Sequence, residues 1–412
     1  MTFARRAGTV IVALVVAPMG LCGCNAAPAG GLEPQSGTGP EGGAVRGTAS
    51  ASGSGSGLGS GLGSARASND PSAFPVDHEA WAKLGFRLDW VGFPFPRQGR
   101  APKVVSLVGY DDVVVAQESD STVTVLEAAT GQRRWATDLT GPLTRFVSLN
   151  RDPLDPNRVI LTSESEAFVL AIPNGNLLGR ERFDRVVNTR GVLDGSMLIY
   201  GTSSGEVLAH RLGVGVKAWG FGTNDPIDAA PVLVGSTVLT VNQGGEVLAL
   251  GTDGKLAGRN RIFGGTATDP VSNGTLAFVA GLDQSLWAFD ESAGLAWRYR
   301  TPGPLRTQPA VFGDRIYVEI RDLGLTALAT ADGTVVWSSK GVAGTVISAR
   351  GGELLVWDDD TETLTLIGAE RGAVLTTAKV PGVEQLFTDG VETSPIYAVS
   401  DKGVVARFVR RK

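Results

Sequence analysis

Short apolar segments recur along this chain at nearly constant spacing in sequence, and a polar turn follows most of them. Eight four-residue segments share this character: Val123–Leu126, Val169–Ile172, Val207–His210, Val247–Leu250, Leu286–Phe289, Leu325–Leu328, Leu364–Ile367 and Val404–Arg407. Their first residues lie 38 to 46 residues apart. Strand-length segments that repeat about every 40 residues are typical of radially repeated β architectures. The pattern therefore predicts an all-β fold, the β-propeller.

Residues 303–340 show how one repeat is built. Four runs have the length and alternation of strands: 308–312, 315–320, 325–329 and 334–338. Short turns rich in Asp and Gly join these runs, as in antiparallel hairpins. The resulting four-stranded sheet is apolar on both faces, so it must stack on copies of itself. Closing the stack into a ring removes its exposed ends.

The number of repeats predicts eight four-stranded antiparallel blades, with seven as the alternative. Seven full units extend from about Lys103 to Val383, and an eighth begins near Gln385 and ends after three strands. Residues 85–90 have strand character and can supply its missing outer strand. Pairing the N-terminal and C-terminal strands in one blade would close the ring.

Tryptophans recur at one place in the repeat. A Gly follows most of the apolar segments, and a Trp often comes three or four residues after that Gly. A large ring with one N–H donor suits packing on the Gly-rich turn of the next blade. We therefore expect a structural, blade-docking role rather than cofactor stacking for Trp90, Trp135, Trp219, Trp297 and Trp337.

The spacing Ala-x-x-x-Gly-x-x-x-Trp, seen most clearly up to Trp337, resembles the quinoprotein-type repeat over residues 85–412. The resemblance implies an eight-bladed propeller. It also implies two branches of function: pyrroloquinoline-quinone dehydrogenases, and cofactor-free outer-membrane protein assembly factors of the BamB family. A shared fold does not decide between them.

Few residues are available for the chemistry of the enzyme branch. By the resemblance, that branch holds its quinone between a Trp and two adjacent cysteines, with calcium and a catalytic Asp. The chain contains two cysteines, Cys22 and Cys24, and two histidines, His78 and His210. We therefore predict no catalytic residues, no cofactor and no metal, and thus a protein that is not an enzyme. A quinone-dependent dehydrogenase or its degenerate relative, and an envelope sensor of ligands or glycans, are the alternatives.

Other polar motifs have simpler explanations. Residues 201–205 match Gly-x-Ser-x-Gly, but they lie between two predicted strands and not at the strand-to-helix turn of a nucleophile. Asp358–Asp360 with Glu362 is interpreted as a solvated hairpin tip rather than a calcium loop. Residues 77–79 precede the ring in a short helical or coil segment. The basic C-terminal end, from Arg407 to Lys412, is interpreted as a solvated tail.

The longest step between repeats, from Val123 to Val169, carries its extra residues at 150–157. Insertions in repeats map to loops on one face, often the binding face. We therefore name a candidate interaction loop: Asp152, Pro153, Asp155 and Pro156. A tolerated loop without a role is the alternative.

The N-terminus has the pattern of a lipoprotein signal. Arg5 and Arg6 precede an apolar stretch, residues 7–21, which is too short for a comfortable transmembrane helix. It ends in Leu-Cys-Gly-Cys, which resembles the lipobox of bacterial lipoproteins. By that resemblance Cys24 carries the lipid and becomes the new N-terminus; two or three acyl chains form a stable anchor. An ordinary secretory signal cleaved elsewhere and twin-arginine export are the alternatives.

Composition divides the chain into three parts. Residues 25–70 are mostly Gly, Ser, Ala and Pro, which cannot bury enough apolar surface to order themselves. The predicted organisation is a signal peptide at 1–23, a lipidated Cys with its linker at 24–70, and the propeller domain at 71–412. The formal net charge is −5, and −7 without the signal peptide, so nucleic acid is not an expected partner.

These features together predict a non-catalytic, lipid-anchored scaffold for protein–protein contacts in the cell envelope. The resemblance implies envelope proteins as partners, among them the β-barrel assembly machinery, in addition to the membrane that holds the anchor. Asn25 follows the modified Cys, where an Asp would favour the inner membrane. The expected location is therefore the outer membrane, facing the periplasm.

Overall fold

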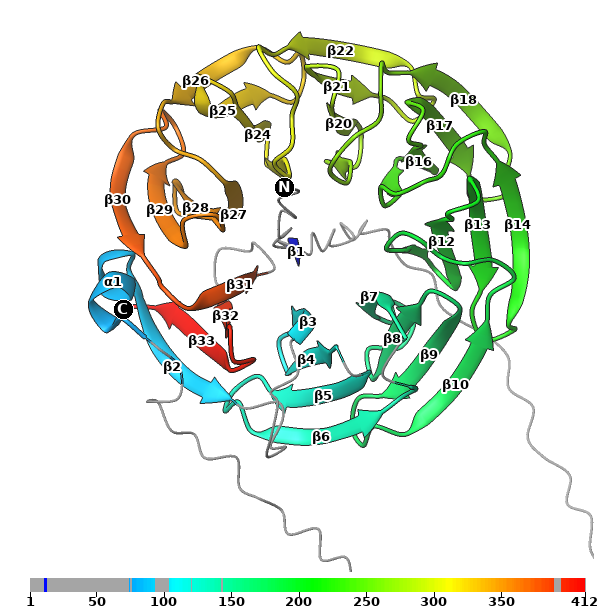
Figure 1. Ribbon diagram of the computed structural model, residues 1–412, viewed down its shortest axis with the longest axis horizontal. Helices are drawn as coiled ribbons and strands as arrows, with labels where there is room; N and C mark the ends of the chain where they lie inside the picture. The colour runs from blue at the N-terminus through cyan, green and yellow to red at the C-terminus, as the bar shows by residue number, and fades with distance from the viewer. Residues whose placement is uncertain are drawn as a thin grey trace, which may run out of the picture. The chain divides into compact units, whose positions relative to one another are not determined.

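Eight antiparallel sheets stand around a ring in the order of the chain (Figure 1). The computed structural model describes residues 11–12, 74, 76–92, 104–119, 121–141, 144–388 and 394–411. Within these residues the chain is almost entirely strand. The prediction of an eight-bladed β-propeller is confirmed, and the seven-bladed alternative is wrong.

Each of the first seven blades takes four strands from one continuous stretch of chain, and its last strand lies at the outside of the ring (Figure 1). Blades 1 and 2 contain β3 (Val104–Gly109), β4 (Val113–Glu118), β5 (Thr122–Glu127), β6 (Arg133–Asp138), β7 (Phe146–Arg151), β8 (Arg158–Ser163), β9 (Glu166–Ala171) and β10 (Leu177–Arg182). Blades 3 and 4 contain β11 (Val192–Asp194), β12 (Met197–Gly201), β13 (Glu206–Arg211), β14 (Val216–Gly222), β15 (Val232–Val234), β16 (Thr237–Val241), β17 (Glu246–Gly251) and β18 (Leu256–Arg261).

Blades 5 to 7 repeat this arrangement. Their strands are β19 (Val271–Ser272), β20 (Ala277–Gly281), β21 (Ser285–Phe289), β22 (Leu295–Arg300), β23 (Ala310–Phe312), β24 (Arg315–Ile320), β25 (Gly324–Ala329), β26 (Val335–Ser339), β27 (Thr345–Arg350), β28 (Glu353–Asp358), β29 (Thr363–Gly368) and β30 (Val374–Lys379). In blade 6 the second strand has the predicted bounds, and the other three agree with the prediction to within two residues.

The eighth blade joins the two ends of the chain. It contains β31 (Val383–Thr388), β32 (Ile396–Ser400), β33 (Val405–Arg410) and, outermost, β2 (Phe86–Gly92). Strands β2 and β33 are antiparallel, with Phe86 opposite Arg410 and Gly92 opposite Val405. The predicted closure of the ring by an N-terminal strand is therefore confirmed.

A further two-residue strand, β1 (Ile11–Val12), pairs in parallel with Phe387 and Thr388 of β31. It lies in the stretch interpreted above as a signal peptide, for which no strand was predicted. Blade 8 has the four strands typical of the other blades even without β1.

Burial follows the position of a strand within its blade. All residues of the second strands β4, β16 and β20 are buried, because both faces of the sheet pack against neighbouring blades. On the outer strands, exposed and half-buried residues alternate, as in Leu256–Arg261. The apolar core is thus a ring of inter-blade layers rather than one central mass.

The short helix α1 (His78–Lys83) covers the junction between blades 7 and 8. Its N-cap, Asp77, accepts hydrogen bonds from the backbone N–H groups of Glu79 and Ala80. Trp81 is 1% exposed and stacks on Phe408 of β33, with 3.6 Å between the ring centroids. Among the described residues, no helix has the length and apolar character needed to cross a membrane.

We predict that Trp81→Ala weakens the closure of the ring. Removing a buried Trp side chain leaves a cavity and typically lowers the free energy of unfolding by about 3–5 kcal/mol. Urea denaturation followed by circular dichroism measures the change. Phe263→Ala is the control, since that ring is 73% exposed and its loss should change stability by about 0.5 kcal/mol or less. Equal stability of the two variants would show that α1 does not support the ring.

Candidate functional site

One contact recurs between successive blades. The indole N–H of a Trp on an outer strand donates to a backbone carbonyl in the third turn of the next blade. The pairs are Trp90 with Ala128 (2.9 Å), Trp135 with Ile172 (2.6 Å), Trp219 with Thr252 (2.8 Å), Trp297 with Thr330 (2.8 Å) and Trp337 with Ala369 (2.8 Å). The structure thus places all five sequence-predicted tryptophans at inter-blade positions.

Each of these rings also lies against a glycine of the same turn. Gly333, for example, has φ +72°, and a Cβ added to it would lie 2.5 Å from Cε3 of Trp297. The corresponding glycines of the other four turns are equally close to their rings: Gly131, Gly175, Gly254 and Gly372. The absence of a side chain lets the indole approach the backbone closely enough for its hydrogen bond.

Three of the eight junctions lack the outer-strand Trp, and two of these, after blades 2 and 4, use polar side chains instead. Gly179 of blade 2 stands opposite Val169, and the contact to blade 3 is made by Glu181, which lies 2.8 Å from Nε2 of His210. In blade 4 the amide of Asn260 donates to the carbonyl of Ala293 at 2.9 Å. Neither contact was predicted, because a lone Glu or Asn in an outer strand has no sequence signature.

The repeat itself has a different register in two blades. In blade 1 the bulged pairing sets Val125 opposite Trp135 and Leu126 opposite Arg133. In blade 2 the residue equivalent to Val125 is Val169, because the bulge in the pairing follows it. The apolar segment of this repeat is therefore 167–170, and the predicted segment 169–172 is two residues too late. In blade 8 the residue equivalent to Val125 is Arg407. The apolar segment is therefore 405–408, one residue later than the predicted 404–407.

The candidate interaction loop joins β7 and β8, as predicted, and its polar groups bond within the loop. The carboxylates of Asp152 and Asp155 accept from the backbone N–H groups of Leu154 and Asn157. The guanidinium of Arg151 donates to the carbonyl of Pro156. Pro153 stands between the two Asp residues, and at the tip Leu154 is 67% exposed. An interaction role for this loop stays a prediction.

Ion pairs tie strands together on several outer surfaces. Arg180 and Arg182 on β10 both contact Glu166 on β9, and the hydrogen bond from Arg180 is the largest influence that lowers the pKa of this carboxyl. At Asp112, burial alone would raise the pKa. The hydrogen bond and charge of Arg151 outweigh burial, so the pKa of Asp112 is lowered. These groups therefore act as structural pairs at neutral pH.

The weaker motifs lie in turns, as predicted. Residues 201–205 form the hairpin between β12 and β13. The acidic residues 358–362 connect β28 and β29, and burial followed by its acidic neighbours raises the pKa of Asp359. Within the described ranges, no group of three or more His, Cys, Asp or Glu side chains has the arrangement of a metal site.

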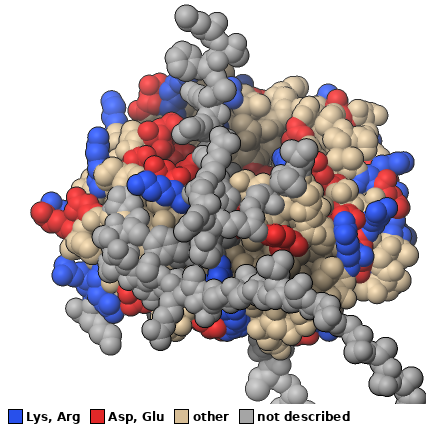
Figure 2. All heavy atoms as spheres, turned by 60° about the horizontal axis from the view of Figure 1, so that its bottom comes forward, with Lys and Arg blue, Asp and Glu red and all other residues tan. Residues whose placement is uncertain are grey.

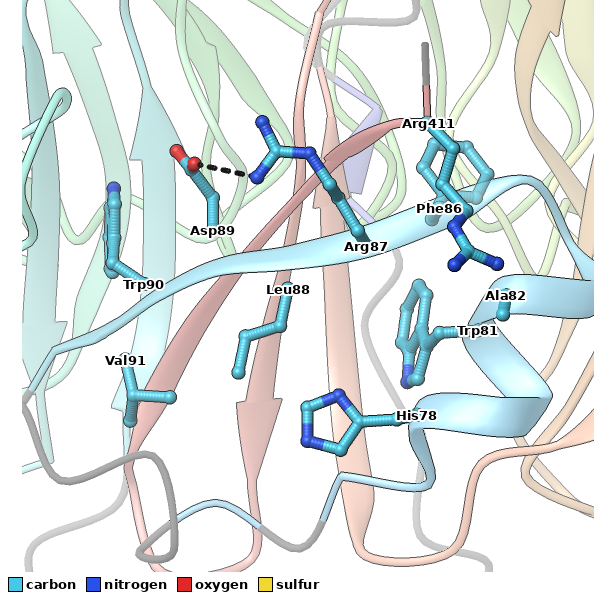
Figure 3. Close-up of a pocket in the computed structure, with 10 residues that line it drawn as sticks. All are labelled: His78, Trp81, Ala82, Phe86, Arg87, Leu88, Asp89, Trp90, Val91 and Arg411. Carbon is cyan, nitrogen blue, oxygen red and sulfur yellow. Dashed lines mark ion pairs between the residues drawn. The ribbon is translucent and has the colours of Figure 1, made fainter.

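A pocket of about 440 Å³ lies between α1 and the outer strand of blade 8 (Figure 3). Six consecutive residues of β2, Phe86 to Val91, line it. The helix contributes His78, Trp81 and Ala82, and Arg411 lies beside Phe86. The pocket is thus a groove along the edge of a strand, and we call it the closure groove.

The closure groove is rich in hydrogen-bond donors. Its one carboxylate, Asp89, pairs with Arg407 and lies 3.5 Å from the guanidinium of Arg87. Among the described side chains, no acceptor contacts His78, Arg411 or the indole N–H of Trp81, whose nitrogen is at the ring edge nearest His78 in Figure 3. The interpretation of the C-terminal end as a solvated tail is therefore wrong for residues 407–410, which belong to β33.

Elsewhere the visible surface shows no segregation of charge. On the face in Figure 2, Lys and Arg side chains alternate with Asp and Glu side chains. Cys24, the predicted lipidation site, lies outside the described residues.

The comparisons with known proteins agree with this architecture. Three overlapping stretches, 96–221, 203–340 and 291–385, match the family model described as outer membrane protein assembly factor BamB. No curated protein matches the chain in sequence. The match confirms the predicted resemblance to that family.

Solved structures also resemble the chain. BamB from Moraxella catarrhalis is 16% identical, with a TM-score of 0.60 over 74% of this chain and 96% of that one. The computationally designed Ika8 protein is 14% identical, with a TM-score of 0.62 over 76% and 98%. The C-terminal WD40 domain of Sif2 is 12% identical, with a TM-score of 0.62 over 76% and 97%. At such low identities these likenesses show the fold alone.

We predict that Gly333→Ala destabilises the ring more than Gly313→Ala does. Both glycines have positive φ, +72° and +60°, so both variants carry the same kind of backbone strain. Only at Gly333 does the added Cβ meet Trp297, whereas at Gly313 nothing lies within 4 Å. The extra loss should be about 1–3 kcal/mol in urea denaturation. Equal losses would contradict a docking role for the indole.

Proposed function

The chain belongs to the family described as outer membrane protein assembly factor BamB, and from this membership we propose that it is a non-catalytic scaffold in the assembly of outer-membrane β-barrel proteins. The family match over residues 96–385 is the observation that carries the proposal. Its partners are envelope proteins, and the machinery that inserts β-barrels is the principal one.

The roles of the tryptophans and the position of the accessible sites on the propeller support a scaffold. The tryptophans that a quinone enzyme could stack on a cofactor donate instead to backbone carbonyls of the next blade, as Trp297 does to Thr330. The loop at 152–157 joins the two inner strands of blade 2, and the closure groove lies along the outer strand of blade 8, both on structure fixed by blade packing. A rigid body with accessible edges suits a protein that holds others in place.

The proposed anchor places this scaffold at a membrane. The segment that ends in Cys24 has the pattern of a lipoprotein signal, and residues 25–70 form a linker rich in Gly, Ser, Ala and Pro. A flexible linker of this length has a root-mean-square reach of roughly 35–40 Å. The propeller domain, residues 71–412, is therefore tethered to the periplasmic face of the outer membrane and reaches partners beside it.

We predict that Cys24→Ala releases the protein from membranes. Without the thiol there is no site for the lipid, and stable anchoring needs more than one acyl chain. Fractionation of cells that express the full chain, with labelled palmitate as the second readout, measures the change. The control is Cys22→Ala, because that residue would leave with the signal peptide. A Cys24→Ala protein that stays wholly in the membrane fraction would contradict the lipid anchor.

We predict that the full-length protein co-purifies with the β-barrel assembly machinery. An affinity tag inserted in the Gly/Ser run near Gly57 avoids both the signal and the ring. Proteins captured from detergent-solubilised membranes are identified by mass spectrometry, with untagged cells as the control. Enrichment of barrel-assembly components is the expected outcome. Their absence from a preparation that captures the tagged chain would refute this role and leave the anchor untouched.

A further inference from the structure

Among the described residues, no strand pairs with the outer edge of β2. In its sheet the order of strands ends with β2, which pairs on its other side with β33. A free edge presents N–H and C=O groups that a further strand can pair with. Proteins use such edges to recognise extended peptides, because the main-chain hydrogen bonds need no particular sequence.

The closure groove gives this edge a bounded site. Its six lining residues on β2, Phe86 to Val91, are consecutive, so the groove follows the strand for about 20 Å, at roughly 3.3 Å per residue. Helix α1 runs beside it and supplies His78, Trp81 and Ala82. The same helix also contacts β30, the outer strand of blade 7, and the described chain places no helix beside the outer strands of blades 1 to 6. An extended segment of about six residues fits the length of the groove.

The charge of the groove selects the kind of segment. Arg87 and Arg407 share one carboxylate, Asp89, and Arg411 has no carboxylate partner among the described residues. On other outer strands some arginines are paired within the blade, as Arg259 is by Glu246 at 3.1 Å, whereas Arg300 has no ion pair among the described residues. The groove therefore has an excess of positive charge and of N–H donors, which an acidic ligand would satisfy.

We propose that the closure groove binds an extended, acidic segment of a partner protein, which adds to β2 as a further strand at the outer edge of blade 8. The backbone of the segment pairs with the edge of β2, and its carboxylates lie near Arg87 and Arg411. This binding goes beyond the proposed function and does not depend on barrel assembly.

The test uses defined probes on the purified protein with residues 1–23 removed. Fluorescein-labelled acetyl-(Thr-Glu)4-amide is the acidic probe, and (Thr-Gln)4 and (Thr-Lys)4 are the neutral and basic ones. Fluorescence anisotropy should show saturable binding of the acidic probe alone, weakened several-fold between 50 and 300 mM salt because the charges are screened. No saturable binding of the acidic probe up to 1 mM would overturn the proposal.

Two variants assign the site. Arg411→Glu should weaken binding of the acidic probe about tenfold, since it reverses a charge at the groove. Arg300→Glu is the matched control: Arg300 is an exposed arginine on the outer strand β22, with no ion pair among the described residues. Circular dichroism melting shows that both variants fold. Equal weakening by both would mean general attraction to a basic surface and would overturn the site.

Backbone methylation tests strand addition. Two versions of the acidic probe carry N-methyl groups on all odd or all even residues, so one of them must block the N–H groups that face β2. At least one should bind tenfold more weakly or worse. Binding of both methylated probes as tightly as the unmethylated one would overturn strand addition. The protein is also tested for binding to anionic phosphatidylglycerol vesicles. If it binds them only when Arg411 is present, and does not bind the acidic peptide, the groove is a lipid site and the peptide proposal is refuted.

Discussion

The ring depends on the contact between an outer strand and a turn of the following blade. Where a Trp makes it, as Trp337 does to Ala369, the contact combines a buried ring, a hydrogen bond to a backbone carbonyl and a glycine under the ring. Such a hydrogen bond contributes about 0.5–1.5 kcal/mol, and an isolated blade has no turn to receive it. Stability therefore belongs to neighbouring pairs of blades, as in other repeat proteins.

Variation at this contact shows what the ring requires. Blade 4 replaces the indole with the amide of Asn260, and blade 2 replaces it with Glu181 against His210. Between blades 7 and 8 the helix α1 supplies the aromatic ring from outside the sheet, through Trp81. What is constant is a side chain from one blade, or from the helix beside it, that packs on or hydrogen-bonds to the next blade. Its chemical type is free to change, and this freedom explains why the repeats differ in sequence.

The sequence was sufficient for the fold because the third strands are nearly identical in pattern and spacing. It placed the closure strand, residues 85–90, within two residues of β2. The register of the repeats was harder to predict. In blades 2 and 8 the predicted segments differ from the observed ones, because apolar residues continue on both sides of the third strand. Hydropathy alone therefore does not locate the bulge. The closure groove was not predictable, since it combines residues near 80 with Arg411, which only the closed ring brings together.

Blade 8, which closes the ring, also differs from the other blades in how its strands are connected along the chain. Blades 1 to 7 are continuous in sequence, so each forms from local hairpins, whereas blade 8 needs pairing across more than 300 residues, between β2 and β33. The outer strand of this blade follows the proposed tether directly, so any pull from the membrane acts on α1 and β2 before it reaches the rest of the ring. A segment added to β2 would extend the same sheet and share that load. The proposed anchor and the proposed groove would then act on one strand, which couples partner binding to the stability of closure.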